Sequence, residues 1–148
     1  MRPLNFPSYR FRIKNTEKGP LIFDVIRKKF VALQPEEWVR QHAVRYLSET
    51  KGYPLSLINV EKQLLVNGLR KRYDIIVYRS DGTIFLLVEC KAPKVSITQE
   101  VFDQIAIYNL ELEAELLMVT NGLQHVQCKM DRVREKYDFL EEVPEFSR

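Results

Sequence analysis

The sequence predicts a mixed α/β fold, in which helices pack on a central β-sheet. Three observations support this prediction. The chain has 148 residues, a length typical of one domain. It is 45% hydrophobic and 29% charged, a composition typical of globular proteins. Segments with strand-like patterns are interspersed with two segments of helical periodicity, and turns rich in glycine, proline or asparagine separate them.

The first 33 residues are expected to form a β-hairpin extension. Strands over residues 9–14 and 21–26 flank Lys18-Gly19-Pro20, a combination typical of a turn. The structural core is expected over residues 34–130, and residues 131–148 form a C-terminal tail. One domain of 148 residues therefore contains all three parts.

A helix is predicted over residues 35–51. Pro35 suits the first helical position, and the acidic Glu36 and Glu37 suit the positive first turn. Gly52 and Pro54 end the helix. One apolar stripe with helical spacing is expected to face the sheet, and it consists of Val39, Ala43, Tyr46 and Leu47.

Three strands follow over residues 57–66, 73–79 and 83–91, with Asn67-Gly68 and Asp81-Gly82 as hairpin turns. A second helix is predicted over residues 98–113, and its apolar stripe is Val101, Ile105, Tyr108 and Leu112. Residues 116–120 form a buried strand, and residues 126–130 form another. For the tail from Asp131 onward, a short helix and a strand both remain open.

Several classes of protein are excluded by simple observations. The longest apolar run, residues 84–88, is far shorter than the roughly 20 residues of a membrane span. No apolar stretch follows the first five residues, so no secretory signal peptide is expected. Cys90 and Cys128 form no CxxC pair, which favours reduced thiols in a cytoplasmic protein over a zinc site. Neither GxxxxGK[ST] nor GxGxxG occurs, so neither a nucleotide-binding motor nor a dinucleotide-binding fold is expected.

Charge is distributed unevenly along the chain. The net charge is only +3, but residues 1–72 carry +9 and residues 73–148 carry −6. The basic residues cluster at Arg10, Arg12 and Lys14, at Arg27, Lys28 and Lys29, and at Arg70, Lys71 and Arg72. A phosphate-binding surface and an ordinary solvated surface both remain open from this pattern.

The segment from Arg72 to Lys91 contains the residues that suggest chemistry. If Asp81-Gly82 is a two-residue turn, Ser80 pairs with Thr83, Tyr78 pairs with Phe85, and Asp74 lies opposite Glu89. Side chains alternate along a strand, so Asp74, Glu89 and Lys91 share one face. Directly opposed Cβ atoms lie roughly 4.5–5.5 Å apart.

Two opposed carboxylates at the end of an apolar sheet face need a neutralising cation. Mg²⁺ takes one or two carboxylates and keeps water or phosphate oxygens in its other positions. A metal-bound water is acidified, and a neighbouring lysine can orient or deprotonate it. Hydrolysis of a phosphodiester fits this arrangement. The alternative is an exposed strand end, where Glu89 and Lys91 form an ion pair and Asp74 begins a strand.

The chain resembles the N-terminal nuclease domain of type I restriction enzyme R subunits, within the PD-(D/E)xK nuclease superfamily. The resemblance spans roughly residues 35–122. It is carried by Pro35-Glu-Glu-Trp-Val-Arg-Gln41, Gly52-Tyr-Pro54, Arg72-Tyr-Asp-Ile-Ile-Val-Tyr78, Val88-Glu-Cys-Lys-Ala-Pro93, Gln104-Ile-Ala-Ile-Tyr-Asn109 and Met118-Val-Thr-Asn-Gly122. It implies a restriction-endonuclease-like fold, with a mixed central β-sheet flanked by helices.

The resemblance also implies roles for individual residues. Asp74, Glu89 and the backbone carbonyl of Cys90 would be metal ligands, and Lys91 would be the catalytic lysine. A glutamate of the first helix often completes such sites, with Glu37 the better candidate and Glu36 the weaker one.

Gln104 and Tyr108 match the family's Q-x-x-x-Y signature, which is associated with the active site and with DNA contacts. On the residues alone, Gln104 is equally well explained as an ordinary helix-edge residue. Glu61 either supports the site or is a solvated or salt-bridged residue.

The function expected from these observations is a Mg²⁺-dependent DNA endonuclease domain, in which Mn²⁺ can substitute. Its partners would be double-stranded DNA and either restriction-modification subunits or a separate helicase motor, with no membrane association. The expected DNA contacts are Arg27, Lys28, Lys29, Arg70, Lys71 and Arg72. Two departures from the family stand out: Tyr73 replaces the superfamily's proline, and these 148 residues contain no helicase motor, so a stand-alone relative and a domain of a longer protein both remain open. A nucleic-acid-binding or assembly module without turnover and an RNA nuclease remain alternatives.

Overall fold

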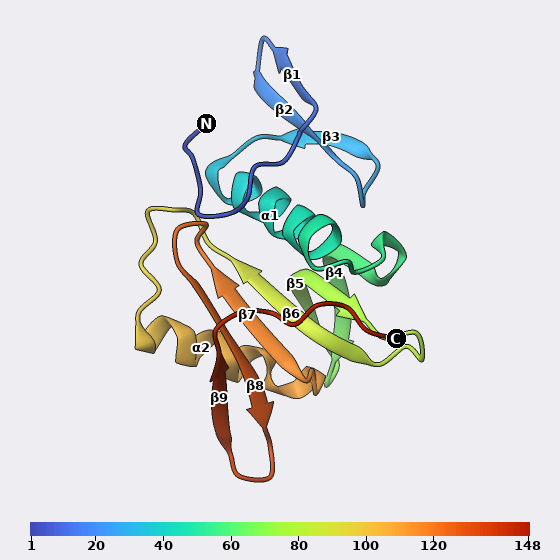
Figure 1. Ribbon diagram of the computed structural model, residues 1–148, viewed down its shortest axis with the longest axis vertical. Coiled ribbons are helices and arrows are strands. Elements are labelled where there is room, and N and C mark those ends of the chain that lie inside the picture. Colours follow the sequence, from blue (N-terminus) through green and yellow to red (C-terminus); the bar gives the residue numbers. More distant parts are fainter.

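The computed structural model describes all 148 residues and contains two β-sheets and two α-helices (Figure 1). The first sheet has the order β1-β2-β3 and consists of β1 (Ile13–Thr16), β2 (Gly19–Asp24) and β3 (Lys29–Ala32). It stands at one end of the molecule, on the far side of helix α1 from the second sheet. Helix α1 (Pro35–Arg45) continues into a π-helical turn, Tyr46–Thr50.

The second sheet has six strands in the order β4-β5-β6-β7-β8-β9. Only the β6–β7 pair is parallel, and the other neighbours are antiparallel. Helix α2 (Gln99–Asn109) connects the two parallel strands. The strands are β4 (Ile58–Val66), β5 (Leu69–Tyr78), β6 (Ile84–Cys90), β7 (Leu116–Thr120), β8 (His125–Asp131) and β9 (Lys136–Leu140). The predicted mixed sheet flanked by helices is therefore confirmed.

Two apolar clusters fill the two faces of this sheet. Val39, Ala43 and Leu47 of the α1 segment are fully buried on one face, against Ile75 and Val88. The C-terminal tail packs on this face too, through Val143 and Phe146. The second cluster joins α2 to the opposite face, around Ile76, Leu87 and Leu117. The strands between the helices are apolar on both sides because both faces are covered.

Two local predictions need correction, and one open alternative is decided. The N-terminal extension is a three-stranded sheet, because Lys29–Ala32 forms a third short strand that follows directly on a run of basic residues. In the tail, where helix and strand were both open, Lys136–Leu140 forms a strand, β9, which extends the second sheet. The buried face of α2 consists of Phe102, Ala106 and Asn109, one position away from the predicted stripe. A polar residue, Asn109, belongs to this buried face, and its Nδ2 donates to the carbonyl of Ile105 at 2.7 Å.

No helix is both long and apolar enough to cross a membrane.

Candidate metal centre

Strands β5 and β6 place Asp74 opposite Glu89. Ile75 pairs with Val88 and Ile76 with Leu87, so Asp74 and Glu89 are the next residues along the two strands, and their carboxyl groups interact. The pairing near the turn differs from the prediction, since Tyr78 pairs with Ile84 and not with Phe85. The sequence therefore predicts the register at the site correctly, although the turn is different.

Two departures from the expected hairpin cancel each other. The loop contains three residues, 80–82, because the Arg79 N–H donates to the Thr83 carbonyl at 2.8 Å. Gly82 ends this loop with a φ of +89°, a left-handed conformation that favours glycine. A β-bulge between Val77 and Tyr78 then shifts the pairing by one residue. The extra loop residue and the bulge together restore the register that a two-residue turn would give.

The carboxylate of Asp74 is held from two sides. Its Oδ2 accepts a hydrogen bond from the Cys90 N–H at 2.8 Å, and its Oδ1 accepts one from Arg40 Nη2 at 2.9 Å. Tyr73 packs in the cluster on the α2 side, and Ile75 packs in the cluster on the α1 side. Strict alternation would place these two on one face. The local break in alternation at Asp74 lets this residue meet Arg40 of α1 and the backbone of β6 together.

Glu89 is the least satisfied member of the pair. Its Oε1 is buried and has no hydrogen-bond partner. Burial raises the pKa of Glu89 to about 9, and the adjacent Asp74 carboxylate contributes to the increase, whereas Lys91 opposes it. A buried acceptor without a partner is uncommon in native proteins and indicates a missing proton, water or cation.

Arg40, which sequence reasoning missed, is the main cation at this site. It is only 5% exposed. Its guanidinium lies 2.8 Å from both Glu37 and Glu61, and 2.9 Å from Asp74. Burial alone would lower the pKa of Arg40, but the carboxylates of Asp74 and Glu37 raise it well above its usual value. A detectable signal was the spacing, because Arg40 follows Glu37 by three residues on one helix.

The two glutamates at the start of α1 have different surroundings. The Glu37 carboxylate accepts hydrogen bonds from Arg27 Nη2 and Arg40 Nη1, both at 2.8 Å, and from Gln41 Nε2 at 3.1 Å. It therefore connects α1 to the N-terminal sheet, with its oxygens already occupied. Glu36 is half exposed, and burial and the negative charge of Asp74 raise its pKa. The structure thus places the weaker sequence candidate, Glu36, in the electrostatic field of the Asp74–Glu89 pair.

Lys91 follows β6 directly. Its backbone N–H donates to the Thr120 carbonyl at 2.8 Å, which anchors the chain at the end of the parallel β6–β7 pair. Its positive charge lowers the pKa values of Glu89 and Glu36 against the larger effect of burial. The thiol of Cys90 is fully buried, and burial raises its pKa. Cys90 can therefore contribute only backbone groups to the site.

Gln104 and Tyr108 lie on α2, across the sheet from α1, and both are exposed. Tyr108 reaches the site only indirectly, because its ring lies 5.7 Å from the ring of Tyr73. The Tyr73 hydroxyl is buried without a partner. Burial raises the pKa of Tyr73 to about 12, and the negative charges of Tyr108, Glu111 and Glu89 contribute to the increase. Tyr73 therefore contacts Tyr108 of the Q-x-x-x-Y pair and immediately precedes Asp74 in the chain.

The six predicted DNA-binding residues differ in whether their side chains are held in ion pairs or are exposed. Arg27 forms ion pairs with Asp24 at 2.7 Å and with Glu37 at 2.8 Å. Lys71 contacts Glu111 at 3.1 Å, and Arg72 contacts Glu61 at 3.5 Å. The remaining three side chains are exposed: Lys28, Lys29 and Arg70. Arg27 is therefore part of the internal structure, whereas the other five reach the surface.

The chemistry of the donor set fits Mg²⁺. No three His, Cys, Asp or Glu side chains are grouped so that they could hold a metal ion by themselves. The site offers the Asp74–Glu89 pair and the backbone beside it. Mg²⁺ is commonly held by one or two carboxylates while water completes its octahedron. The unpartnered Oε1 of Glu89 is an acceptor that a cation at this position would satisfy.

Comparison with known proteins gives two matches. The sequence model of a family described as the type I restriction enzyme R protein N terminus matches residues 35–144. A solved structure, the fragment of a putative HsdR subunit of a type I restriction enzyme from Vibrio vulnificus YJ016, is similar with a TM-score of 0.55 and 20% sequence identity. The similarity covers 76% of this chain and 24% of that one, and at this identity it shows the fold alone. No curated protein matches.

Proposed function

Because this chain belongs to the family of type I restriction enzyme R protein N-termini, we propose that it is a Mg²⁺-dependent DNA endonuclease domain. The family match covers most of the chain and includes Asp74, Glu89 and Lys91. The substrate is proposed to be double-stranded DNA, and the bond hydrolysed is a phosphodiester.

The observation that supports this proposal most is the state of the Asp74–Glu89 pair. Two carboxylates approach each other at the end of an apolar sheet, and one oxygen of Glu89 is buried without a partner. A purely structural ion-pair cluster would satisfy that oxygen with Lys91 or Arg40. Here Glu89 Oε1 has no hydrogen-bond partner, although the neighbouring carboxylate of Asp74 is held in place by hydrogen bonds.

The residues divide into three roles. Asp74, Glu89 and the carbonyl of Cys90 would hold Mg²⁺, which supplies an acidified water and charge neutralisation at the phosphate. The ammonium of Lys91 orients the attacking water and stabilises negative charge on the phosphate. The Cys90 N–H orients Asp74 through Oδ2, and Arg40 holds Oδ1 in the metal-free protein, where an incoming cation would replace it.

The family also suggests which proteins this chain works with. Type I R subunits act in restriction systems with other subunits, so we propose that such partners, or a separate helicase motor, deliver DNA to this domain. The chain aligns with only 24% of the Vibrio vulnificus fragment. The movement of DNA is accordingly assigned to parts outside this domain.

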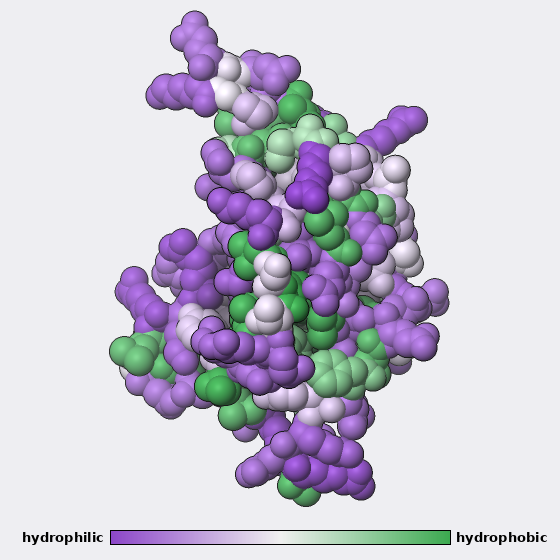
Figure 2. All heavy atoms as spheres, turned by 90° about the vertical axis from the view of Figure 1, so that its left-hand side faces the viewer, coloured by the Kyte–Doolittle hydropathy of each residue, from purple (hydrophilic) through white to green (hydrophobic).

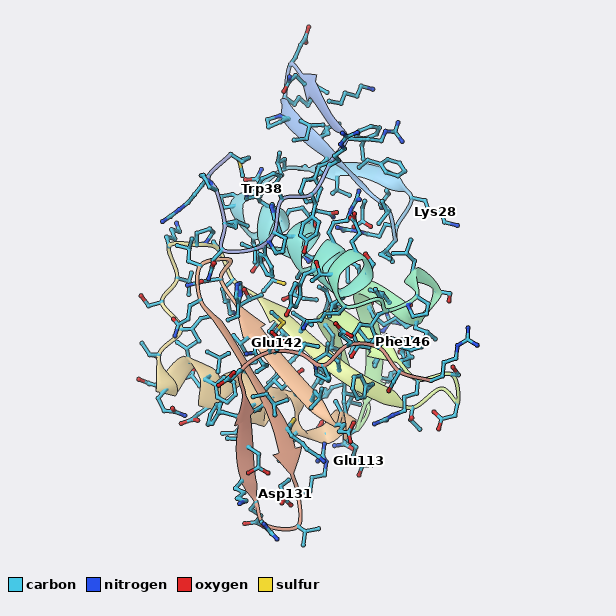
Figure 3. All side chains as sticks on the ribbon, in the orientation of Figure 1. Lys28, Trp38, Glu113, Asp131, Glu142 and Phe146 are labelled. Carbon is cyan, nitrogen blue, oxygen red and sulfur yellow. The ribbon has the colours of Figure 1, made fainter.

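The proposal is tested by nicking of supercoiled plasmid in the presence of Mg²⁺. The wild-type chain should nick the plasmid, and Glu89→Gln should not, because the amide removes a charged ligand. Glu113→Gln is the matched control, since Glu113 is exposed and lies in the lower half of the molecule, away from helix α1 (Figure 3). Equal activity of the wild type and Glu89→Gln would refute the proposed site.

A second candidate is a DNA-binding or assembly module without turnover. Arg40 favours it, because a buried guanidinium already neutralises Asp74 without a metal. Calorimetric titration with Mn²⁺ separates the two candidates. Binding that disappears in Glu89→Gln supports the nuclease, and the absence of binding in the wild type, together with the absence of nicking, supports the module.

A further inference from the structure

The outward face of the N-terminal sheet combines cations with aromatic rings. Strand pairing places Lys14 beside Leu21, and the Phe23 N–H donates to the Arg12 carbonyl at 2.9 Å. Phe23 pairs with Phe30, and their rings are 5.3 Å apart. The guanidinium of Arg12 lies over both rings, 4.6 Å from Phe23 and 5.4 Å from Phe30. The ammonium of Lys14 lies 5.7 Å from Phe30.

This arrangement keeps the cations extended and available. A guanidinium stacked on a ring uses its π-face for the ring and keeps its N–H groups at the edge for another partner. Arg12 and Lys14 are both exposed. Stacking restricts their rotamers in advance, which reduces the entropy lost when they bind a ligand.

The surrounding charge is strongly positive. Residues 10–29 contain seven basic and two acidic side chains, a net charge of +5. One of the two acids, Asp24, is fully buried and is neutralised by Arg27. The free cations besides Arg12 and Lys14 are Arg10, Lys18, Lys28 and Lys29, all exposed. Hydrophilic side chains project from this end of the molecule around a small apolar patch (Figure 2).

The sheet is connected to the candidate metal centre by a continuous chain of ion pairs. Arg27 joins Asp24 of β2 to Glu37 of α1. Arg40 joins Glu37 to Asp74, with distances of 2.8 and 2.9 Å. Gln41 adds a second connection, because its amide donates to Asp24 at 3.0 Å. The position of the sheet relative to Asp74 is therefore fixed by buried contacts.

We propose that this face, centred on Arg12 and Lys14, is a DNA-backbone binding surface that holds the duplex for the carboxylate site. The inference rests on the proposed function and adds a surface outside residues 35–144, the segment that matches the family. Phosphate fits the observed chemistry because it pairs with free guanidinium and ammonium groups at an otherwise positive surface. Aromatic rings beneath the cations provide apolar contact for sugar or base atoms.

The test measures DNA binding alone, without divalent metal. A fluorescent duplex is titrated with the full chain at several salt concentrations, and anisotropy gives the affinity. Arg12→Gln with Lys14→Gln should weaken binding at least about tenfold and reduce the slope of log affinity against log salt by about 2, because each lost phosphate contact contributes about 0.9. The control, Lys129→Gln with Arg132→Gln, removes two exposed cations from the opposite end of the molecule (Figure 1) and should change neither quantity.

Separate outcomes distinguish this inference from the nuclease proposal. Glu89→Gln, which should not nick DNA, should keep the salt slope of the wild type. If the wild type does not nick DNA but the Arg12/Lys14 variant shows the expected loss of affinity and salt slope, the binding surface is supported and only the nuclease proposal is refuted. Wild-type affinity and slope in the Arg12/Lys14 variant, an equal loss in the control, or no DNA binding by the wild type would each overturn the inference. Thermal melts of all variants show whether the sheet is still folded.

Discussion

Replacing Arg40 by glutamine should destabilise the metal-free protein strongly. The guanidinium lies within 2.9 Å of three carboxylates, those of Glu37, Glu61 and Asp74, and is 5% exposed. Removing one partner from a buried charge network typically costs about 3–5 kcal/mol, because the remaining charges lose their compensation. Arg40→Gln should lose free energy of unfolding in this range, measured by urea denaturation in EDTA.

Mg²⁺ should restore part of that loss. In the wild type, Arg40 occupies Asp74 Oδ1, so an incoming cation meets a competitor. The variant lacks this competitor and contains more uncompensated negative charge, so it should bind Mg²⁺ more tightly. A ligand present at about 100 times its dissociation constant stabilises the folded state by about 2.7 kcal/mol. The increase in stability on adding Mg²⁺ should therefore be larger for Arg40→Gln than for the wild type.

Arg45→Gln provides the matched control on the same helix. Arg45 pairs only with the exposed Glu49, at 3.0 Å, and its guanidinium lies 5.3 Å from the Phe11 ring. An exposed ion pair of this kind contributes less than about 1 kcal/mol. The reasoning about Arg40 is refuted if Arg40→Gln is no less stable than Arg45→Gln in EDTA, or if Mg²⁺ stabilises both variants and the wild type equally.

Three further predictions concern single residues. Lys91→Ala should abolish nicking while calorimetric metal binding survives, because the lysine acts on water and phosphate; nicking at the wild-type rate would contradict its assignment. In the metal-free protein, burial raises the pKa of Glu89 to about 9, so its stabilising contribution is complete below pH about 4.5 and is lost as pH rises towards 9. In thermal melts across this pH range, Glu89→Gln should lose less stability with rising pH than the wild type. Equal pH profiles for the two proteins would refute the raised pKa of Glu89. Gly122→Ala should destabilise the fold by about 1–2 kcal/mol, because its φ is +87° and a Cβ would lie 2.8 Å from Leu4; a neutral effect in urea denaturation would show that the N-terminal segment gives way.

Local patterns predicted the framework of the site well. Three members of the predicted stripe, Val39, Ala43 and Leu47, are completely buried, as a helix packed on a sheet requires, and the fourth, Tyr46, is partly buried. Asn67-Gly68 forms the expected hairpin turn between β4 and β5, where Val66 pairs with Leu69. These features depend on spacing within one element or one turn, which the sequence shows directly.

The register at the site was predicted correctly for a reason that was partly wrong. The loop after Arg79 has one residue more than a two-residue turn, and the bulge between Val77 and Tyr78 compensates for it. Only the sum of the two effects places Asp74 opposite Glu89. A bulge is set by packing of the surrounding sheet, which a single sequence does not reveal.

The electrostatic partners were not predictable from local patterns. Glu36 and Glu37 are adjacent in sequence, but neighbouring helical residues point about 100° apart. One therefore meets Arg27 and Gln41, and the other lies near Asp74. The position of Arg40 among three carboxylates from α1, β4 and β5 depends on how these elements meet in space. The Glu37–Arg40 pair has a helical spacing that the sequence shows, but the contacts of Arg40 with Glu61 and Asp74 leave no spacing in the chain that sequence reasoning could detect.

The most direct test of the central claim is anomalous diffraction from crystals soaked in Mn²⁺. The account predicts one strong anomalous peak between the carboxylates of Asp74 and Glu89, with metal–oxygen distances of about 2.0–2.2 Å and the Cys90 carbonyl in the coordination sphere. The same peak should be absent from Glu89→Gln crystals. A wild-type site with no anomalous density, with Arg40 still bound to Asp74 and Glu89 still unligated, would contradict the account.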